Sequence, residues 1–202
     1  DPLRELEAET GRRIFTVLQL RVHPKLIALR ERLLAERPGK PHEVVLTYVT
    51  GRGAWYDVSW KGQMDKSGGV PTNIGIHFFD LLTWLFGDVE AQRVHIKQPR
   101  RMAGSIALAR ARVKWFLSVD AKDLPFAPEP GGRATYRSIT VDGEEVEFSE
   151  GFTDLHTVVY REVFAGRGHG IDDVRPSIAL AHAIRTAEPV SVGDDAHPKL
   201  RG

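Results

Sequence analysis

Three polar side chains interrupt an otherwise apolar stretch, residues 74–86, whose composition predicts a buried helix. Asn73 stands at the head of the stretch, and His77 and Asp80 lie inside it. Helical residues three or four positions apart share a face, so the three side chains form one polar stripe. Polar groups are costly to bury without partners, so the stripe must meet either other protein groups or a ligand.

Three interpretations of this stripe are open from spacing alone. In the first, Asn73 caps the helix and His77 is a core imidazole fixed by Asp80. In the second, His77 and Asp80 bind a metal, which needs a third strong ligand nearby, and none is visible. In the third, the stripe faces a ligand and His77 acts as acid or base, because the ordinary pKa of histidine lies near neutrality.

The segment before the stripe is rich in aromatic and cationic side chains. Residues 51–62, GRGAWYDVSWKG, include Arg52, Trp55 and Tyr56. Exposed aromatics beside a cation suit a sugar or a nucleobase, but the same residues can fold back as a satellite core. The Ser-Gly-Gly at 67–69 then allows either close approach of the backbone to a ligand or a tight turn.

Two further places hold polar residues with ligand-binding potential. Gln19, Arg21 and His23 lie at the end of a predicted strand, where side chains of α/β sheets commonly meet ligands, although they can also be solvated. His156 and Tyr160 lie one turn apart on a predicted helix and therefore share a face. Core packing and ligand contact are both compatible with that pair.

Composition indicates a globular protein and excludes several classes. The 202 residues carry 28 Lys and Arg against 27 Asp and Glu, so no basic excess points to nucleic acid or to a membrane surface. The absence of cysteine excludes disulfides, thiolate zinc sites and a thiolate nucleophile. No signal peptide is visible, and the longest apolar run is too short to span a bilayer. We expect a cytoplasmic protein.

Periodicity and turn residues predict an α+β fold. The first forty residues look like part of an α/β unit, and the remainder predicts an open, mainly antiparallel sheet with helices on one face. Asp142-Gly143 is the strongest hairpin motif, and a change of parity near Ala111 suggests a bulge in one long strand. The expected helices are 2–10, one opening at Pro24, 74–86, 152–166 and 174–187; the expected strands are 13–22, 43–53, 89–99, 105–120, 134–141 and 144–148; the tail from 193 is expected to be frayed or peripheral.

No recognisable nucleotide-binding motif occurs in the chain. AGRGHG, residues 165–170, holds Gly-x-Gly but follows a predicted helix, whereas the dinucleotide fingerprint needs a strand before it. Neither a Walker-type loop nor a Gly-x-Ser-x-Gly elbow is present.

The polar stripe also carries a family resemblance. The motif S-G-G-x3-N-x-G-x-H-x2-D, residues 67–80, resembles the catalytic helix of the Gfo/Idh/MocA oxidoreductases, which commonly read G-G-x3-D-x-G-x-H-x2-D. With GRGAWYDVSWKG, NIGIHFFDLLTWLFG, VKWFLSVDAKDLP and GFTDLHTVVYREVFAG, it looks most like UDP-N-acetylglucosaminuronate 3-dehydrogenases of the WlbA/WbpB type. The resemblance implies NAD as cofactor, a nucleotide-sugar substrate used in lipopolysaccharide and O-antigen biosynthesis, and a homo-oligomer (dimer or tetramer) formed through the sheet face.

The same resemblance implies two domains. Residues 1–22 would be a remnant, the last helix and strand, of an N-terminal Rossmann domain, and residues 23–202 a C-terminal domain for substrate binding and oligomerisation. The Gly-x-Gly-x-x-Gly loop and a catalytic Lys in a Glu-Lys-Pro segment would lie in a part that this chain does not contain. We therefore expect no cofactor-binding residue and no metal ligand in this chain, which should be inactive alone.

The resemblance assigns roles residue by residue. His77 matches the active-site His, which holds the hydroxyl being oxidised or takes its proton. Asn73 matches a position that is usually Asp; because an amide cannot take up a proton, Asn73 is expected to orient substrate while the base role shifts toward the Lys outside this chain. Asp80 is expected to buttress the helix. The expected substrate contacts are Arg21, His23, Arg52, Trp55, Tyr56 and Tyr160.

Two other function classes compete with this one. A non-catalytic sugar-sensing or dimerisation module could keep the sheet and lose the chemistry, although retention of His77 argues weakly against it. A metal-dependent hydrolase is a distant third.

Overall fold

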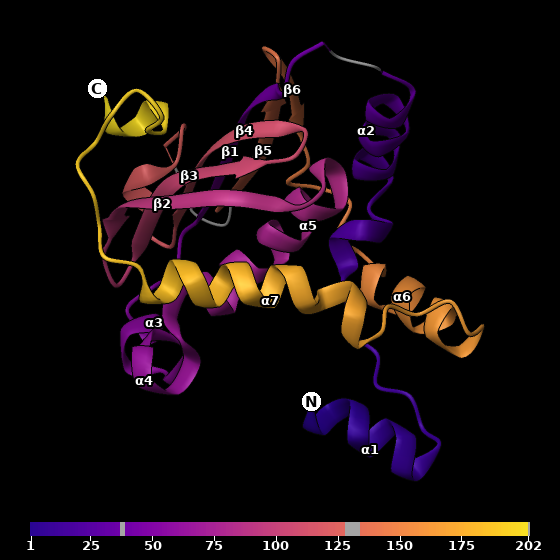
Figure 1. The fold of residues 1–202 in the computed structure, drawn as a ribbon. Coiled ribbons are helices and arrows are strands. Elements are labelled where there is room, and N and C mark those ends of the chain that lie inside the picture. The colour runs from indigo at the N-terminus through magenta and orange to yellow at the C-terminus, as the bar shows by residue number, and fades with distance from the viewer. Residues whose placement is uncertain (37–38, 128–133, 202) are drawn as a thin grey trace.

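One open, six-stranded sheet organises the chain (Figure 1). The structure is a computed structural model and describes residues 1–36, 39–127 and 134–201. The sheet has the strand order β2-β3-β4-β1-β5-β6. β1 and β4 pair in parallel, and the other neighbours pair antiparallel, which confirms the predicted mainly antiparallel sheet. The strands are β1 His42–Thr50, β2 Val89–Lys97, β3 Arg101–Leu108, β4 Ala111–Ser118, β5 Thr135–Val141 and β6 Glu144–Glu147.

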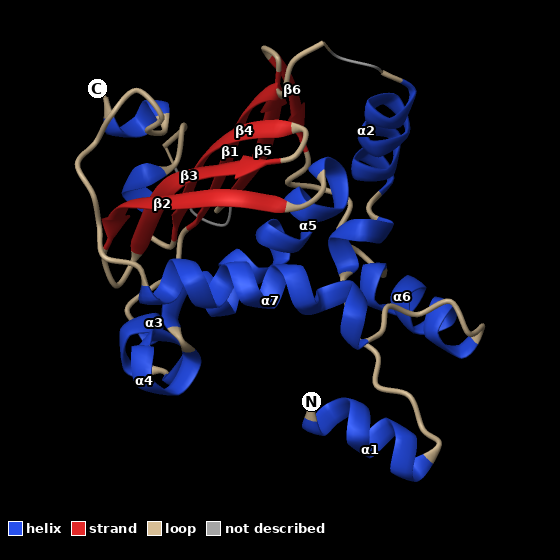
Figure 2. Ribbon diagram, in the orientation of Figure 1, coloured by secondary structure: helices blue, strands red, loops and turns tan. Residues whose placement is uncertain are grey.

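Helices gather on one face of this sheet, as predicted (Figure 2). The longer helices are α1 Pro2–Thr10, α2 Pro24–Ala35, α5 Ile76–Phe86, α6 Leu155–Phe164 and α7 Ile171–Thr186. The shorter helical segments are Gln19–Val22, α3 Trp55–Val58, Trp60–Gly62, α4 Met64–Ser67, the π-helical turn Pro71–Gly75, Ala121–Asp123 and Pro198–Leu200. No described helix is both long enough and apolar enough to cross a membrane.

The main core lies between the sheet and α5, α7 and α2. Strand residues alternate between two faces, so Leu46 and Trp115 point to the helices and are fully buried. The opposite face, called the outer face below, bears a second, smaller cluster around Val49, Ala103 and Phe116. Helix α5 is therefore held on a rigid support along its whole apolar side.

The Asp142-Gly143 hairpin is confirmed. Both residues have positive φ, 51° and 92°, which is the backbone geometry that this turn pair favours. β5 and β6 pair across the turn, with Val141 opposite Glu144.

The single strand predicted at 105–120 is wrong. The structure has a hairpin there: β3 ends at Leu108, β4 begins at Ala111, and Leu108 pairs with Ala111. The change of parity therefore marks a two-residue turn at Ala109 and Arg110 and not a bulge. Neither turn residue is Gly, Asn, Asp or Pro, so composition did not reveal the turn.

The strand predicted at 13–22 is also wrong. In the described chain this segment makes one isolated bridge, between Thr16 and His169, and then forms the 3-10 turn Gln19–Val22. β-branched and apolar residues make a strand only where a neighbouring strand supplies its hydrogen bonds. Here Leu18 and Leu20 are buried by packing instead.

The C-terminal tail is peripheral but not frayed. It runs over the outer face, where Ala196 and His197 are buried. His197 lies 3.0 Å from the Thr47 hydroxyl, and burial, with smaller effects of Lys199 and Lys114, lowers its pKa to about 4. The Pro- and Gly-rich sequence of residues 125–133 predicts a loop, and this segment lies mostly outside the described residues.

Gly104 gives a stability prediction for the sheet. A Cβ on Gly104 would lie 2.0 Å from the Arg93 carbonyl oxygen and 2.8 Å from the Trp115 ring, so the strands would have to move apart. We expect Gly104→Ala to lower the free energy of unfolding by about 1–3 kcal/mol in a urea titration. Gly53→Ala is the control, because its Cβ would meet only Trp55 Cδ1, at 3.5 Å. Equal losses in the two variants would contradict the prediction.

Candidate functional site

A cavity of about 200 Å³ opens beside the start of α5. It collects residues from the 3-10 turn Gln19–Val22, from the end of β1, from the π-helical turn and α5, from β5, and from the segment before α6. The lining residues are Gln19, Leu20, Tyr48, Arg52, Asn73, Ile74, His77, Phe78, Arg137 and Phe152.

His77 reaches the cavity because of how α5 begins. The chain enters through the π-helical turn Pro71–Gly75, so Asn73 lies inside a helical turn and is not an N-cap. Single π turns are rare and frequently occur at functional sites. The following turns anchor the helix: Phe79 and Leu82 are fully buried. The structure thus brings Asn73 and His77 together on the cavity wall, as the spacing predicted.

The environment of His77 favours its neutral form. Burial is the main cause and lowers the pKa of His77, His156 lowers it further, and the Asp80 carboxylate opposes them. No described residue makes a hydrogen bond to His77. Its imidazole can therefore hold a ligand hydroxyl and accept a proton from it near neutral pH.

The charged residues of the cavity wall are cationic. Arg52 and Arg137 both line it, and none of the described lining residues carries a carboxylate. The guanidinium of Arg137 lies 4.0 Å from the Phe152 ring centroid and 5.4 Å from the Tyr48 ring centroid. These two aromatic contacts hold the guanidinium against the cavity wall. The Nε atom of Arg52 is buried without a hydrogen-bond partner in the described structure. This charge distribution suits an anionic ligand.

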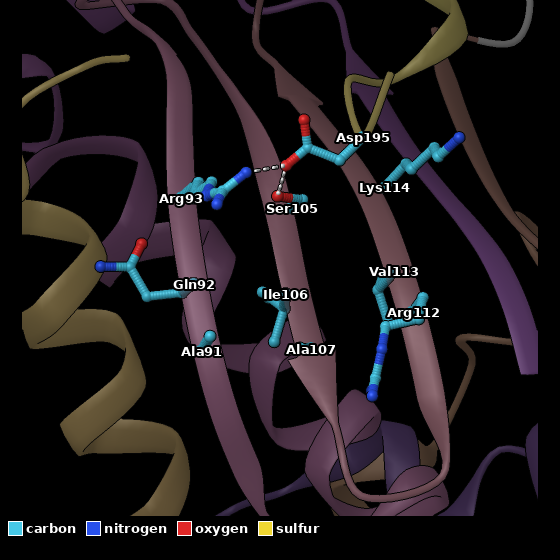
Figure 3. Close-up of a pocket in the computed structure, with 10 residues that line it drawn as sticks. All are labelled: Ala91, Gln92, Arg93, Ser105, Ile106, Ala107, Arg112, Val113, Lys114 and Asp195. Atoms are coloured by element: carbon cyan, nitrogen blue, oxygen red, sulfur yellow. Dashed lines mark hydrogen bonds and ion pairs between the residues drawn. The ribbon is translucent and has the colours of Figure 1, made fainter. Parts of the chain in front are cut away.

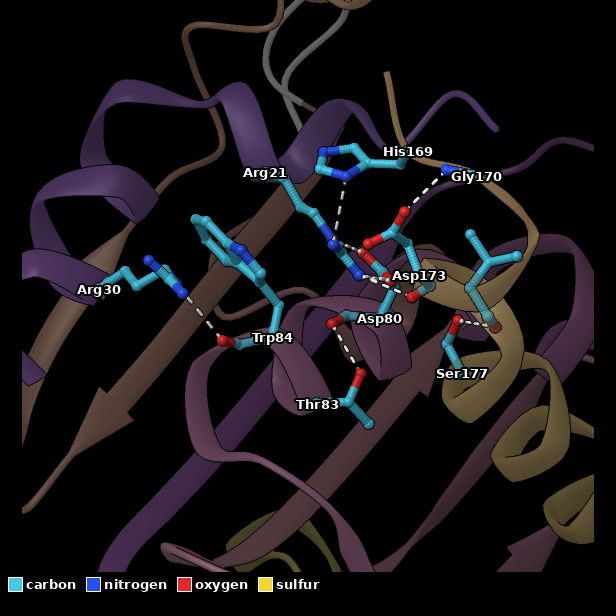
Figure 4. Close-up of polar contacts among 10 residues, drawn as sticks. Arg21, Arg30, Asp80, Thr83, Trp84, His169, Gly170, Asp173 and Ser177 are labelled. Atoms are coloured by element: carbon cyan, nitrogen blue, oxygen red, sulfur yellow. Dashed lines mark hydrogen bonds and ion pairs between the residues drawn. The ribbon is translucent and has the colours of Figure 1, made fainter. Parts of the chain in front are cut away.

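Asp80 does not fix His77; it pairs with Arg21 (Figure 4). Arg21 Nε and Nη2 donate to the two carboxylate oxygens at 2.9 and 2.7 Å, and Nη2 also donates to the Asp173 carbonyl at 3.1 Å. His169 Nδ1 lies 3.5 Å from Arg21 Nη1. The pair therefore ties α5 to the 3-10 turn and to α7. This agrees with a buttressing role for Asp80. Arg21 was expected to contact substrate, but its guanidinium makes these hydrogen bonds to protein groups.

The other predicted substrate contacts are dispersed. His23 is buried, contacts the Glu150 carbonyl at 2.8 Å through Nε2, and packs against Phe152 behind the cavity wall. Tyr56 is also buried, and its hydroxyl has no hydrogen-bond partner among the described residues. Trp55 and Tyr160 are half-exposed and outside the cavity lining. Of the six residues, only Arg52 lines the cavity.

Sequence reasoning missed several lining residues. Arg137 was detectable, because β5 alternates and its inward positions are Arg137, Ile139 and Val141; a cation in an apolar row is unusual. Gln19 was not missed: it was singled out with Arg21 and His23 as a residue that could meet a ligand, and it lines the cavity. Tyr48 and Phe152 carried no motif, since an aromatic on a strand or before a helix is ordinary core material. In the described chain, His, Asp and Glu form no cluster of three that could hold a metal ion.

Comparison with known proteins shows what the chain is similar to. Residues 30–111 match the family model of the Gfo/Idh/MocA oxidoreductases, C-terminal alpha/beta domain. The chain is 56% identical to the WlbA (WbpB) dehydrogenase from Thermus thermophilus solved with NAD and alpha-ketoglutarate, with a TM-score of 0.92. Both comparisons place the chain close to the C-terminal part of Gfo/Idh/MocA oxidoreductases. This alignment covers 98% of the chain and 64% of the Thermus protein, so the chain spans less than two thirds of that relative.

Two further solved structures are similar to the chain. The same Thermus dehydrogenase in complex with NAD and UDP-GlcNAcA matches at 55% identity with a TM-score of 0.92, again over 98% of this chain and 64% of that one. The WlbA dehydrogenase from Bordetella pertussis, in complex with NADH and UDP-GlcNAcA, matches at 20% identity with a TM-score of 0.69, over 90% and 64%. At that identity the Bordetella protein supports the fold alone.

Proposed function

We propose that this chain is the substrate-binding and catalytic half of an NAD-dependent dehydrogenase. The enzyme would oxidise the 3-hydroxyl of a UDP-N-acetylhexosaminuronic acid in lipopolysaccharide or O-antigen sugar biosynthesis. The observation that carries the proposal is the 56% identity to the Thermus WlbA dehydrogenase over 98% of the chain. We further propose that the protein works in the cytoplasm.

The cavity suits such a substrate. A uronic acid joined to a diphosphate is anionic at both ends, and Arg52 and Arg137 supply cations on a wall whose described residues include no carboxylate. Trp55 lies beside Arg52, whose guanidinium is 5.5 Å from the indole centroid. We propose that Trp55 provides a stacking surface next to the cavity for the nucleotide part.

The chemistry assigned to this chain concerns the proton. Oxidation of a secondary alcohol removes a hydride, which NAD accepts, and a proton, which needs a base within hydrogen-bond reach. Neutral His77 either takes that proton or holds the hydroxyl for a base outside the chain. Asn73 cannot take up a proton, so we assign it an orienting role.

The chain carries no Gly-x-Gly-x-x-Gly fingerprint between a strand and a helix, the motif by which Rossmann domains hold the pyrophosphate of NAD. We propose that another domain binds NAD and that residues 1–22 are the end of that Rossmann domain. Two observations support this. Figure 1 shows α1 standing apart from the sheet, and Leu3 and Leu6 on α1 are half-exposed.

We also propose a homo-oligomer that forms through the outer face. That face carries a hollow of about 220 Å³, which runs across β2, β3 and β4 beneath the C-terminal tail (Figure 3). Its floor contains the small residues Ala91 and Ala107, and Asp195 closes one end by accepting from Ser105 at 2.7 Å.

A direct assay of the complete protein tests the proposed function. NAD and UDP-N-acetylglucosaminuronic acid should give NADH, followed by absorbance, and a 3-keto sugar, followed by mass spectrometry. The 202-residue chain alone should give neither product. Absence of turnover by the complete protein, with the nucleotide sugar still bound, would favour a sugar-sensing module instead.

A further inference from the structure

One backbone carbonyl is contacted by two side-chain donors. Asn73 Nδ2 donates to the Lys61 carbonyl oxygen at 3.0 Å. Ser67 Oγ lies 2.9 Å from the same oxygen and 3.0 Å from the Gln63 carbonyl oxygen, so its one proton is shared between two acceptors. Asn73 belongs to the π-helical turn that precedes His77, whereas Lys61 and Ser67 belong to residues 51–67, called the aromatic loop below. The Asn73 hydrogen bond therefore joins the aromatic loop to the helix that carries His77, and the Ser67 contact lies within the loop.

The loop folds so tightly that few sequences would permit this convergence. Gly68 has a φ of +76°, and a Cβ there would lie 2.3 Å from Thr72 Oγ1. A Cβ on Gly62 would lie 2.3 Å from the Tyr56 carbonyl oxygen. The Gly69 amide donates to Ser67 Oγ at 3.0 Å, which orients that hydroxyl. The Ser-Gly-Gly turn thus places Ser67 and Asn73 around one oxygen.

The two ends of the aromatic loop are held differently. Near its start, the Arg52 amide donates to the Val119 carbonyl at 3.0 Å, and Arg100 Nη2 donates to the Arg52 carbonyl at 2.6 Å, so this end is fixed to the sheet edge. Beyond it, Trp55 and Trp60 are half-exposed. The Asn73–Lys61 hydrogen bond, called the joint below, therefore ties the distal part of the loop to the π-helical turn that precedes α5.

We propose that Asn73 is a positioning residue that holds the aromatic loop against the helix that carries His77, beside the cavity that Asn73 and Arg52 line, and so sets the affinity for the ligand. A carbonyl oxygen accepts hydrogen bonds only, so residue 73 must present a donor, and an amide does so where an isosteric carboxylate does not. The Lys61 contact also commits one amide N–H, which fixes the orientation of the amide toward the cavity. The identity of the ligand rests on the proposed function, whereas the hydrogen bond between Asn73 and Lys61 does not.

Hydrogen exchange of the loop amides tests the joint in the complete protein. Asn73→Ala and Asn73→Asp should both raise exchange of residues 55–67 roughly fivefold, as expected for loss of one ordinary hydrogen bond. Ser67→Ala should act in the same direction, and its effect should be smaller when Asn73 is already replaced, because both donors serve one acceptor. Unchanged exchange in Asn73→Ala, or a rise in Asn73→Asp alone, would overturn the proposal.

Steady-state kinetics supply the second readout. We expect Asn73→Ala to raise KM for the nucleotide sugar, and Ser67→Ala, which does not line the cavity, to raise it too with little change in kcat. A KM effect in Asn73→Ala with unchanged loop exchange would place Asn73 on the substrate alone and overturn the joint. Absence of turnover in the unmutated protein would count against the proposed function, whereas the exchange experiment would still decide the joint.

Discussion

Replacing Arg21 with methionine is expected to lower the free energy of unfolding by roughly 3–5 kcal/mol. The Arg21 and Asp80 side chains are only 9% and 2% exposed, and Arg21 holds both carboxylate oxygens. Without the guanidinium, a buried carboxylate loses its counter-ion and two charge-assisted donors. Urea denaturation followed by circular dichroism measures the loss.

A matched pair on the surface provides the control. Arg167 also donates to both oxygens of a carboxylate, that of Glu162, but the two side chains are 65% and 38% exposed. Arg167→Met should have little effect on the free energy of unfolding, because solvent screens an exposed pair. The double variant Arg21→Met/Asp80→Leu should recover most of the stability lost by Arg21→Met, because it removes the stranded charge. Equal losses for the Arg21 and Arg167 variants would show that burial does not decide the effect.

Elements with a strong local pattern were predictable from the sequence. The apolar run 74–86 became α5 preceded by its π-helical turn, and Asp142-Gly143 became a hairpin, because both depend on residues adjacent in the chain. The helix opened by Pro24 and the one ended by Gly11 follow from the same kind of local rule. Local rules therefore predicted most helices and the general architecture.

Elements that depend on distant partners were not predictable in the same way. Asp80 and Arg21 are 59 positions apart, so spacing along the helix suggested His77 as the partner of Asp80. The segment 13–22 has the composition of a strand, but in the described chain its only pairing is the bridge at His169. Neither pairing leaves a trace in a single sequence.

The residues of the candidate site also fall into those that local sequence predicts and those that only the fold brings together. His77 and Asn73 were predictable because they share a helical face, and Arg52 because it stands in an unusual run of aromatic residues. Arg137 and Gln19 reach the same cavity from β5 and from the turn before α2, so only the fold brings them there. The role of Asn73 as donor to Lys61 needed side-chain geometry.

Replacing His77 with alanine is expected to reduce kcat of the complete protein about 10²–10⁴-fold. The imidazole lies on the cavity wall, and no neighbouring group of the described wall can substitute as a base of similar pKa. In the proposed function His77 holds the reacting hydroxyl or takes its proton. KM should change much less, because Arg52 and Arg137 remain on the wall to bind the proposed anionic substrate. Substrate binding by calorimetry and turnover by NADH absorbance separate the two effects. His182→Ala, an exposed histidine on α7, serves as the control and should leave both unchanged.

The pH dependence of the reaction should also depend on the protonation of His77. Burial lowers the pKa of His77 below the ordinary value near 6.5, so the active neutral form persists to lower pH, and activity is lost only as pH falls through that lowered pKa. His156 contributes to the lowering. His156→Gln should therefore raise the pKa of His77 and move the acid limb of log kcat/KM to higher pH, with the plateau unchanged. An acid limb that ignores His156 and persists in His77→Ala would assign the titrating base to another group.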